Sequence, residues 1–118
     1  MSVEFIQKLP TPAEIKMQFP LPARLAEIKA EKDKEISRIF TGESDKFLVI
    51  IGPCSADNED AVLDYTTRLA KVQEKVADRL LLIPRVYTNK PRTTGLGYKG
   101  MLHQPDPEKQ PSVSEGLH

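Results

Sequence analysis

The hydrophobic positions of this chain change period from one segment to the next. Residues 47–51 are five apolar residues in succession and end at Gly52-Pro53, a pattern typical of a strand buried on both faces of a parallel sheet. Residues 80–83 form a second apolar run. Between the two runs, apolar residues recur at spacings of three and four, which predicts a helix that lies on a sheet: Val62, Tyr65, Leu69, Val72 and Val76. The pattern therefore predicts a strand, a helix and a parallel second strand.

The polar residues at the ends of these elements agree with that order. Residues 57–60, Asp-Asn-Glu-Asp, supply an N-cap and an acidic first turn for the predicted helix. An acidic cluster can also indicate a metal site, but capping accounts for these residues and neither cysteine nor histidine joins them. Pro84 lies within the second strand, where it removes one ladder hydrogen bond unless its nitrogen faces a bulge or a sheet edge.

Residues 1–22 contain four prolines, which predicts an irregular arm with only short helical turns. Apolar residues nevertheless recur along this arm: Phe5, Ile6, Leu9, Ile15, Met17 and Phe19. Two interpretations stay open, a poorly ordered terminus and an arm that packs on a neighbouring subunit. Residues 22–40 then predict a helix with one apolar face and one solvated face of mixed charge, and Gly42 is a natural stop. We therefore divide the chain into an N-terminal arm and helix, residues 1–43, and an α/β part, residues 44–118.

The composition bounds the class of protein. Apolar residues make up 39% of the 118 residues and charged residues 29%, and 17 cations balance 17 anions, so that no global field favours nucleic acid or a membrane surface as a partner. No run of about 18 apolar residues occurs, and the N-terminal residues lack the pattern of a signal peptide. A single cysteine agrees with a reducing compartment. We expect a cytoplasmic protein without a membrane partner.

Positive charge is concentrated in one segment. No Asp or Glu occurs between Asp78 and Asp106, and five cations fall in that interval: Arg79, Arg85, Lys90, Arg92 and Lys99. Arginine binds phosphate and carboxylate groups bidentately and threonine hydroxyls add donors, so that the segment suits a phosphorylated, multiply anionic substrate. A solvated basic loop is the alternative. RNA binding is disfavoured because only Tyr87 and Tyr98 interleave with the cations.

Cys54 and Ser55 follow the first predicted strand, and most of the basic segment follows the second. In parallel α/β folds, ligands bind at the carboxyl ends of the strands. The thiol and the cations are therefore expected at the same end of two neighbouring strands. A single cysteine after a buried strand is also commonly just a small apolar residue, and the residues alone leave that alternative open.

Four motifs together resemble, in order and in spacing, the first third of the class I 3-deoxy-7-phosphoheptulonate (DAHP) synthases: Ile51-Gly52-Pro53-Cys54-Ser55, Arg85-Val86-Tyr87, Lys90-Pro91-Arg92-Thr93-Thr94 and Gly97-Tyr98-Lys99-Gly100. The resemblance is weak before Phe40 and strong from Phe47 to about Gly116. It implies the beginning of a (β/α)8 TIM barrel, truncated because such a barrel needs about 250 residues. It also implies the first step of the shikimate pathway to aromatic amino acids, the condensation of phosphoenolpyruvate with erythrose 4-phosphate by a transferase.

The resemblance implies a role for each motif. Cys54 would bind an essential divalent metal cation together with a histidine, a glutamate and an aspartate from later strands. Arg85 and Lys90 would be the catalytic residues that hold the carboxylate and phosphate of phosphoenolpyruvate, and the substrate site would be completed, toward erythrose 4-phosphate, by the rest of the motif: Pro91, Arg92, Thr93 and Thr94. His103 is not favoured as a substitute metal ligand, because it lies in an irregular segment without a paired ligand. Family members also use N-terminal extensions in subunit contacts and feedback control, which implies a homo-oligomer for the full-length enzyme.

These inferences predict the N-terminal portion of a synthase that is inactive alone, since the other metal ligands would lie beyond His118. Two apolar strands with about two helices are also expected to self-associate, because their edges and faces stay open. The alternative is a non-catalytic product of the same ancestry, a phosphate-binding or subunit-interaction module. The encoding nucleotide sequence discriminates between the two: continuation past His118 into the rest of the barrel favours the enzyme, and a true stop favours the module.

Overall fold

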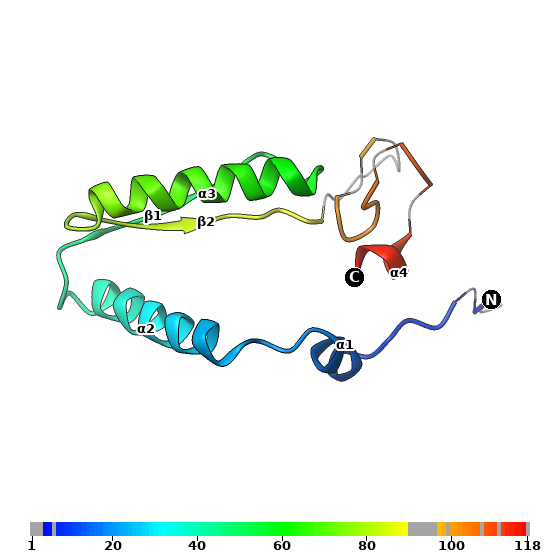
Figure 1. Ribbon diagram of the computed structural model, residues 1–118, viewed down its shortest axis with the longest axis horizontal. Helices are drawn as coiled ribbons and strands as arrows, with labels where there is room; N and C mark the ends of the chain where they lie inside the picture. The colour runs from blue at the N-terminus through cyan, green and yellow to red at the C-terminus, as the bar shows by residue number, and fades with distance from the viewer. Residues whose placement is uncertain are drawn as a thin grey trace.

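The computed structural model describes residues 4–5, 7–89, 97–98, 100–106, 108–110 and 112–117. Along the chain the elements are α1 (Pro12–Gln18), α2 (Ala23–Phe40), β1 (Phe47–Ile51), α3 (Glu59–Val76), β2 (Leu80–Pro84) and α4 (Val113–Gly116). Figure 1 shows α3 lying along the strands, whereas α1 and α2 lie apart from α3 on the other side of the molecule. The structure is therefore α/β, with a helical arm that leads into one strand–helix–strand unit.

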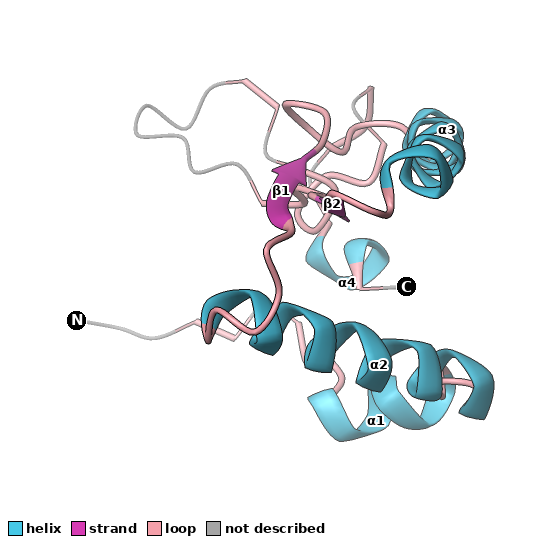
Figure 2. Ribbon diagram, turned by 90° about the vertical axis from the view of Figure 1, so that its left-hand side faces the viewer, coloured by secondary structure: helices cyan, strands magenta, loops and turns pink. Residues whose placement is uncertain are grey.

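The strand–helix–strand prediction is confirmed. β1 and β2 are hydrogen-bonded neighbours in a parallel pair, in a register that joins Phe47 to Leu80 and Ile51 to Pro84. α3 connects them and packs mainly against β2 (Figure 2). Its start agrees with the capping pattern, because the Asn58 side chain accepts a hydrogen bond of 2.9 Å from the Ala61 N–H. The acidic residues that follow Asn58 therefore belong to the first turn of a helix.

Pro84 occupies the last position of β2 without disturbing the pairing with β1. The N–H of the next residue, Arg85, donates to the carbonyl oxygen of Ile51 at 2.9 Å. Alternate residues of a strand direct their N–H groups to opposite edges, so the nitrogen of Pro84 faces away from β1. The ladder between the two strands therefore loses no hydrogen bond at this proline.

The same outer edge of β2 is engaged by a helix side chain. The amide nitrogen of Gln73 on α3 donates to the carbonyl oxygen of Leu80 at 2.9 Å, and the N–H of Leu82 donates to the amide oxygen of Gln73 at 2.6 Å. A side-chain amide carries one donor group and one acceptor, as a peptide group does, and can therefore substitute for a neighbouring strand over one repeat. Gln73 thus satisfies two backbone groups of β2 that face away from β1.

The prediction that the first strand is buried on both faces is wrong for β1. Phe47 is 75% exposed and Ile50 is 65% exposed. Within the described residues only Ala56, at 0%, and Leu81, at 2%, are buried apolar residues. The exposed area is 9691 Å², whereas a compact protein of 13.2 kDa exposes about 6,400 Å². The two-stranded sheet therefore leaves apolar side chains exposed to solvent.

The N-terminal part is helical in two places. α1 begins with a capping box between Thr11 and Glu14, which agrees with the expected short helical turns. α2 begins one position later than predicted, with Pro22 as its N-cap and not in its first turn. It ends before Gly42, whose φ of +79° lies in the left-handed region that favours glycine. The charged face of α2 is solvated, as predicted, and Lys29 pairs there with Asp33 at 2.6 Å.

One ion pair ties α2 to the chain that enters β1. The ammonium group of Lys46 lies 2.9 Å from a carboxylate oxygen of Glu35, and both side chains are less than one-third exposed. The hydrogen bonds from Lys46 and then Lys32 hold the pKa of Glu35 below its ordinary value.

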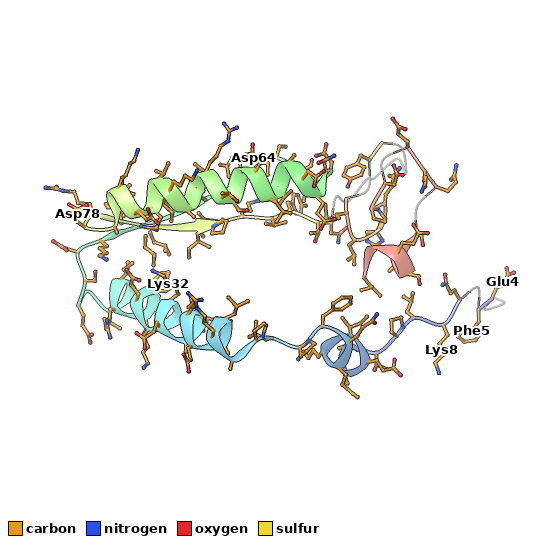
Figure 3. The ribbon with its side chains drawn as sticks, in the orientation of Figure 1. Glu4, Phe5, Lys8, Lys32, Asp64 and Asp78 are labelled. Carbon is orange, nitrogen blue, oxygen red and sulfur yellow. The ribbon has the colours of Figure 1, made fainter. Side chains whose placement is uncertain are left out.

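Large apolar side chains of the arm stay exposed, among them Phe5 near the N-terminus (Figure 3). The division of the chain at residue 43 stays a prediction. The two interpretations of the arm, a poorly ordered terminus and a contact with a neighbouring subunit, both stay open.

Candidate functional site

The carboxyl ends of β1 and β2 lie side by side and carry the first residues of two motifs. Figure 1 shows β2 running toward the end of the molecule where α4 lies, and β1 runs parallel to it. Gly52 follows β1, and Arg85 follows β2. A methyl group at Gly52 would overlap the backbone carbonyl of Arg85, and it would stand 2.8 Å from that carbonyl carbon. Glycine at position 52 is therefore what allows the two strand ends to touch.

The loop after β1 is fixed to the loop after β2 at Ala56. The Ala56 N–H donates to the carbonyl oxygen of Tyr87 at 3.1 Å. The carbonyl oxygen of Ala56 accepts a hydrogen bond of 3.0 Å from the Tyr98 hydroxyl. Because Ala56 is fully buried, water does not compete for these two backbone groups. Cys54 and Ser55 thus lie in a short loop that is held on both sides.

Tyr98 keeps its proton under ordinary conditions. Burial is the main cause that raises the pKa of its hydroxyl above the usual value, and the negative charge of Asp57 adds to it. A protonated phenol is a hydrogen-bond donor, which is what the Ala56 carbonyl requires. The charge environment therefore supports the bond that joins residues 98 and 56.

Arg85 is exposed at the carboxyl end of β2. Its guanidinium carbon lies 4.9 Å from the centroid of the Tyr87 ring, which is a cation–π distance. A guanidinium group presents N–H donors in a fork that matches a planar anion. The arrangement suits a carboxylate or a phosphate group bound bidentately.

Cys54 is exposed in the loop between Gly52 and Ala56. A thiolate is a suitable ligand for a divalent transition metal. Within the ranges that the structure describes, no group of three or more His, Cys, Asp and Glu side chains gathers that could hold a metal ion. The described part of the chain therefore offers Cys54 as one candidate ligand and does not complete a metal site.

The remaining predicted site residues lie outside the described residues: Lys90, Pro91, Arg92, Thr93 and Thr94. Lys99 lies outside them as well. Their roles stay predictions. The two flanks of this segment are described, since the Leu102 N–H donates to the carbonyl oxygen of Thr88 at 2.8 Å and Tyr98 bonds to Ala56. The structure thus places Cys54 and Arg85 in the loops that follow two adjacent strand ends, and it gives hydrogen bonds at Thr88 and Tyr98, on either side of the basic motif.

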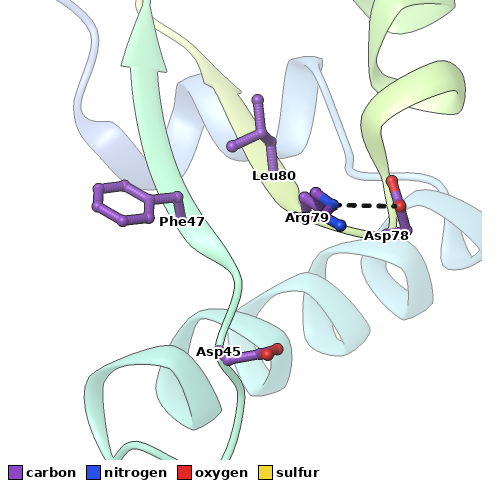
Figure 4. A pocket seen from close by; sticks show the side chains of 5 residues that line it. All are labelled: Asp45, Phe47, Asp78, Arg79 and Leu80. Carbon is purple, nitrogen blue, oxygen red and sulfur yellow. Dashed lines mark ion pairs between the residues drawn. The ribbon is translucent and has the colours of Figure 1, made fainter.

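Arg79 does not belong to this group of cations. β2 separates Arg79 from Arg85, and a rise of about 3.3 Å per residue places their backbones about 20 Å apart. Arg79 lies at the amino end, 3.9 Å from Asp78, beside a hollow of 490 Å³ that Asp45, Phe47 and Leu80 also line (Figure 4). Arg79 and Arg85, the two cations of the basic segment that the structure describes, therefore lie at opposite ends of β2.

Two features of the site were not found from the sequence. Ala56 is a small residue in a loop and carries no local signal of its two hydrogen bonds. Tyr98 is separated from Ala56 by 42 positions, so that periodicity, which reports neighbours on one element, gives no indication of the contact. The glycine before Pro53 signals a turn, and only the partner strand shows why a side chain is excluded there.

The fold defines a class: an α/β unit with two parallel strands, whose candidate site residues follow the carboxyl ends of those strands. The sequence of residues 21–118 matches the DAHP synthetase I family, and the chain belongs to that family. None of the described helices is both long and apolar enough to cross a bilayer.

Relatives agree with this assignment. The chain is 38% identical over 112 residues to a phospho-2-dehydro-3-deoxyheptonate aldolase of Amycolatopsis methanolica, covering 95% of this chain and 55% of the relative. It is 37% identical to the Trp-sensitive enzyme of Escherichia coli, again covering 95% of this chain but 32% of the relative. A structure of the Francisella tularensis aldolase of that name superposes with a TM-score of 0.86 at 30% identity, covering 98% of this chain and 33% of the other. The chain thus spans between about one-third and about one-half of the length of these proteins.

Proposed function

We propose that this chain forms the first β/α unit of a 3-deoxy-7-phosphoheptulonate synthase. The reaction joins phosphoenolpyruvate, erythrose 4-phosphate and water into 3-deoxy-7-phosphoheptulonate and inorganic phosphate, the first step of the shikimate pathway. The observation that carries the proposal is the placement of Cys54 and Arg85 at adjacent carboxyl ends of β1 and β2. That is the end of a (β/α) barrel where active sites are built.

In the proposed site, the chain's own residues bind and orient anionic groups. Arg85, which lies at cation–π distance from the Tyr87 ring, presents its N–H groups to the carboxylate or phosphate of phosphoenolpyruvate. Lys90 adds a second positive charge on the same substrate, and Arg92, Thr93 and Thr94 bind the phosphate of erythrose 4-phosphate, with Pro91 restricting the backbone between them. Such contacts hold the two substrates in a reactive orientation, which accounts for a large part of catalysis in condensations of this kind.

Cys54 would contribute one ligand to a divalent metal cation whose other ligands come from outside the described residues. The chemistry that such a metal supplies is polarisation of the aldehyde oxygen of the acceptor sugar. Because the described part of this chain does not complete a metal site, we propose that residues 1–118 alone have no synthase activity. A cytoplasmic location and a homo-oligomeric full-length enzyme complete the proposal.

A chimera tests the proposal directly. The 112 matching residues of this chain replace those of the Trp-sensitive Escherichia coli relative, which supplies the rest of the fold. We expect the purified chimera to consume phosphoenolpyruvate and release phosphate only when erythrose 4-phosphate and a divalent metal are present. Cys54→Ala and Arg85→Ala should abolish or strongly reduce turnover, whereas Arg79→Ala, which removes the same charge at the amino end, should not.

Two outcomes would contradict the proposal. One is a folded chimera without activity, with folding judged by its oligomeric state and its melting curve against the unmodified relative. The other is an active chimera in which neither Cys54→Ala nor Arg85→Ala lowers turnover. The isolated chain serves as the negative control, since measurable turnover by a homogeneous preparation of it would show that the remaining ligands are not needed.

The exposed apolar surface of the arm supports a second candidate, a subunit-interaction module. Met17 on α1 and Phe40 on α2 are among the most exposed large apolar residues of the described chain. Surfaces of this kind mark protein contacts. Pull-down of a full-length synthase by a chain whose chimera is inactive would favour this candidate over the enzyme.

A further inference from the structure

The loop that bears Cys54 is tied to its surroundings at three backbone atoms. At its start, the carbonyl oxygen of Ile51 accepts the Arg85 N–H at 2.9 Å. At its end, the Ala56 N–H donates to Tyr87 at 3.1 Å, and the Ala56 carbonyl accepts the Tyr98 hydroxyl at 3.0 Å. Two of these bonds continue the pairing between the strand ends. The third is made by a side chain from a distant part of the sequence.

The bond from Tyr98 joins the segment after the basic motif to the residue that ends the Cys54 loop. Tyr98 follows the basic motif in the sequence, and Ala56 follows Cys54 by two positions. The other flank of the basic motif is held separately, where Leu102 donates to Thr88 at 2.8 Å. Because Ala56 is fully buried, a hydrogen bond to its carbonyl is sheltered from water and is costly to leave unmade.

We infer that Tyr98 is a positioning residue, whose hydroxyl bonds to the carbonyl oxygen of Ala56 and thereby acts as a latch that holds the Cys54 loop in place. The catalytic meaning of this latch rests on the proposed function, in which Cys54 is a metal ligand and the basic motif binds substrate. The latch itself is a property of the 118-residue chain. It fixes the end of the Cys54 loop at Ala56.

The test removes the hydroxyl and keeps the ring. Tyr98→Phe is compared with the parent chain and with Tyr65→Phe, a matched change at a half-buried tyrosine on α3. Cys54, the one cysteine of the sequence, carries a nitroxide spin label in all three proteins. Electron paramagnetic resonance then reports the mobility of the loop, and amide hydrogen exchange with residue-level fragmentation reports the opening of the Ala56 N–H.

In Tyr98→Phe we expect a larger mobile component in the spectrum of the labelled Cys54 and exchange at Ala56 about fivefold faster, the factor for loss of one ordinary hydrogen bond. Exchange at Leu81 in β2 should not change, which separates a local latch from a general loss of structure. Tyr65→Phe should match the parent in both measurements.

Identical spectra of Tyr98→Phe and the parent, with Ala56 exchange within twofold, would overturn the inference. Equal acceleration at Ala56 and Leu81 would also overturn it, because it would show a general structural role. Neither measurement uses metal or substrate. An inactive chimera would therefore not contradict the positioning role of Tyr98. Conversely, loss of the positioning role would not decide whether the chimera is active.

Discussion

Gly52→Ala is the substitution that tests most directly how the two strand ends are held together. The added methyl group would overlap the carbonyl oxygen of Arg85 and stand 2.8 Å from its carbonyl carbon and 3.0 Å from its Cβ. Ordinary contacts between carbon atoms are about 3.5–4.0 Å, so that a backbone shift on the order of 1 Å is required. The obstructing atoms belong mostly to backbone and cannot rotate away, as a flexible side chain could.

The magnitude follows from two effects. Overpacking of this kind costs about 1–3 kcal/mol, and separation of the strand ends also breaks the 2.9 Å hydrogen bond from Arg85 to Ile51, worth about 1 kcal/mol. A total of about 2–4 kcal/mol corresponds to at least about thirtyfold more frequent opening of this end of the pair. The loss of protection should fall on the Arg85 amide, directly after β2, and on the Ala56 amide in the loop after β1.

Amide hydrogen exchange measures both positions. We expect at least about thirtyfold faster exchange at Arg85 in Gly52→Ala, and in the chimera a fall in kcat/KM, because Arg85 and Cys54 move apart. Gly42→Ala is the matched control: Gly42 has a φ of +79° and nothing within 4 Å of the added methyl, so its cost of about 1 kcal/mol stays at the end of α2. Exchange at Arg85 within threefold of the parent would refute the close approach of the strand ends.

Three further predictions concern association, substrate binding and pH. The chain exposes about 3,300 Å² more surface than a compact protein of its mass, an area typical of obligate interfaces. Size-exclusion chromatography with light scattering should therefore show self-association. A monomer of 13.2 kDa that melts cooperatively would contradict this prediction. In the chimera, Arg85→Ala and Lys90→Ala should each lower kcat/KM at least about tenfold, and unchanged kinetics in both would remove them from the site. Lys46→Met should lower the free energy of unfolding by up to about 1 kcal/mol near neutral pH. Because the pKa of Glu35 is lowered in the folded state, the stabilisation by the ion pair is present above pH 4.5 and is lost as the pH falls through the lowered pKa. The urea midpoints of parent and variant should therefore converge in acid, and a difference that stays constant with pH would exclude a contribution from the pair.

Elements with a local signal were predicted well. The run of residues 47–51 matches β1 residue for residue, because five apolar residues bounded by Gly52-Pro53 describe a strand wherever the rest of the chain lies. The start of α3 was also predicted, since an Asn58 cap acts on amides within its own turn. The family resemblance rests on the same short motifs and is confirmed by the match over residues 21–118.

Features that depend on a distant partner were not predicted. The prediction that β1 is buried on both faces was wrong, because an apolar run predicts a strand but does not show which elements cover its side chains. Arg79 and Arg85 are close in sequence, yet an extended strand carries them to opposite ends of the sheet. Tyr98 and Gln73 each make hydrogen bonds to backbone atoms of another element, and nothing in their own neighbourhood distinguishes them from exposed polar residues.

Gln73 has a consequence for the order in which this unit folds. Its bonds to β2 span only seven and nine positions, whereas β1 and β2 pair across the whole of α3. Closure of loops of about ten residues takes about 10–100 ns, and longer closures are slower and cost more entropy. α3 and β2 can therefore associate before β1 joins them, with the Gln73 amide occupying two backbone groups of β2 and Pro84 offering no N–H on the same edge. Before β2 pairs with β1, its outer edge is thereby protected from pairing with a strand of another chain.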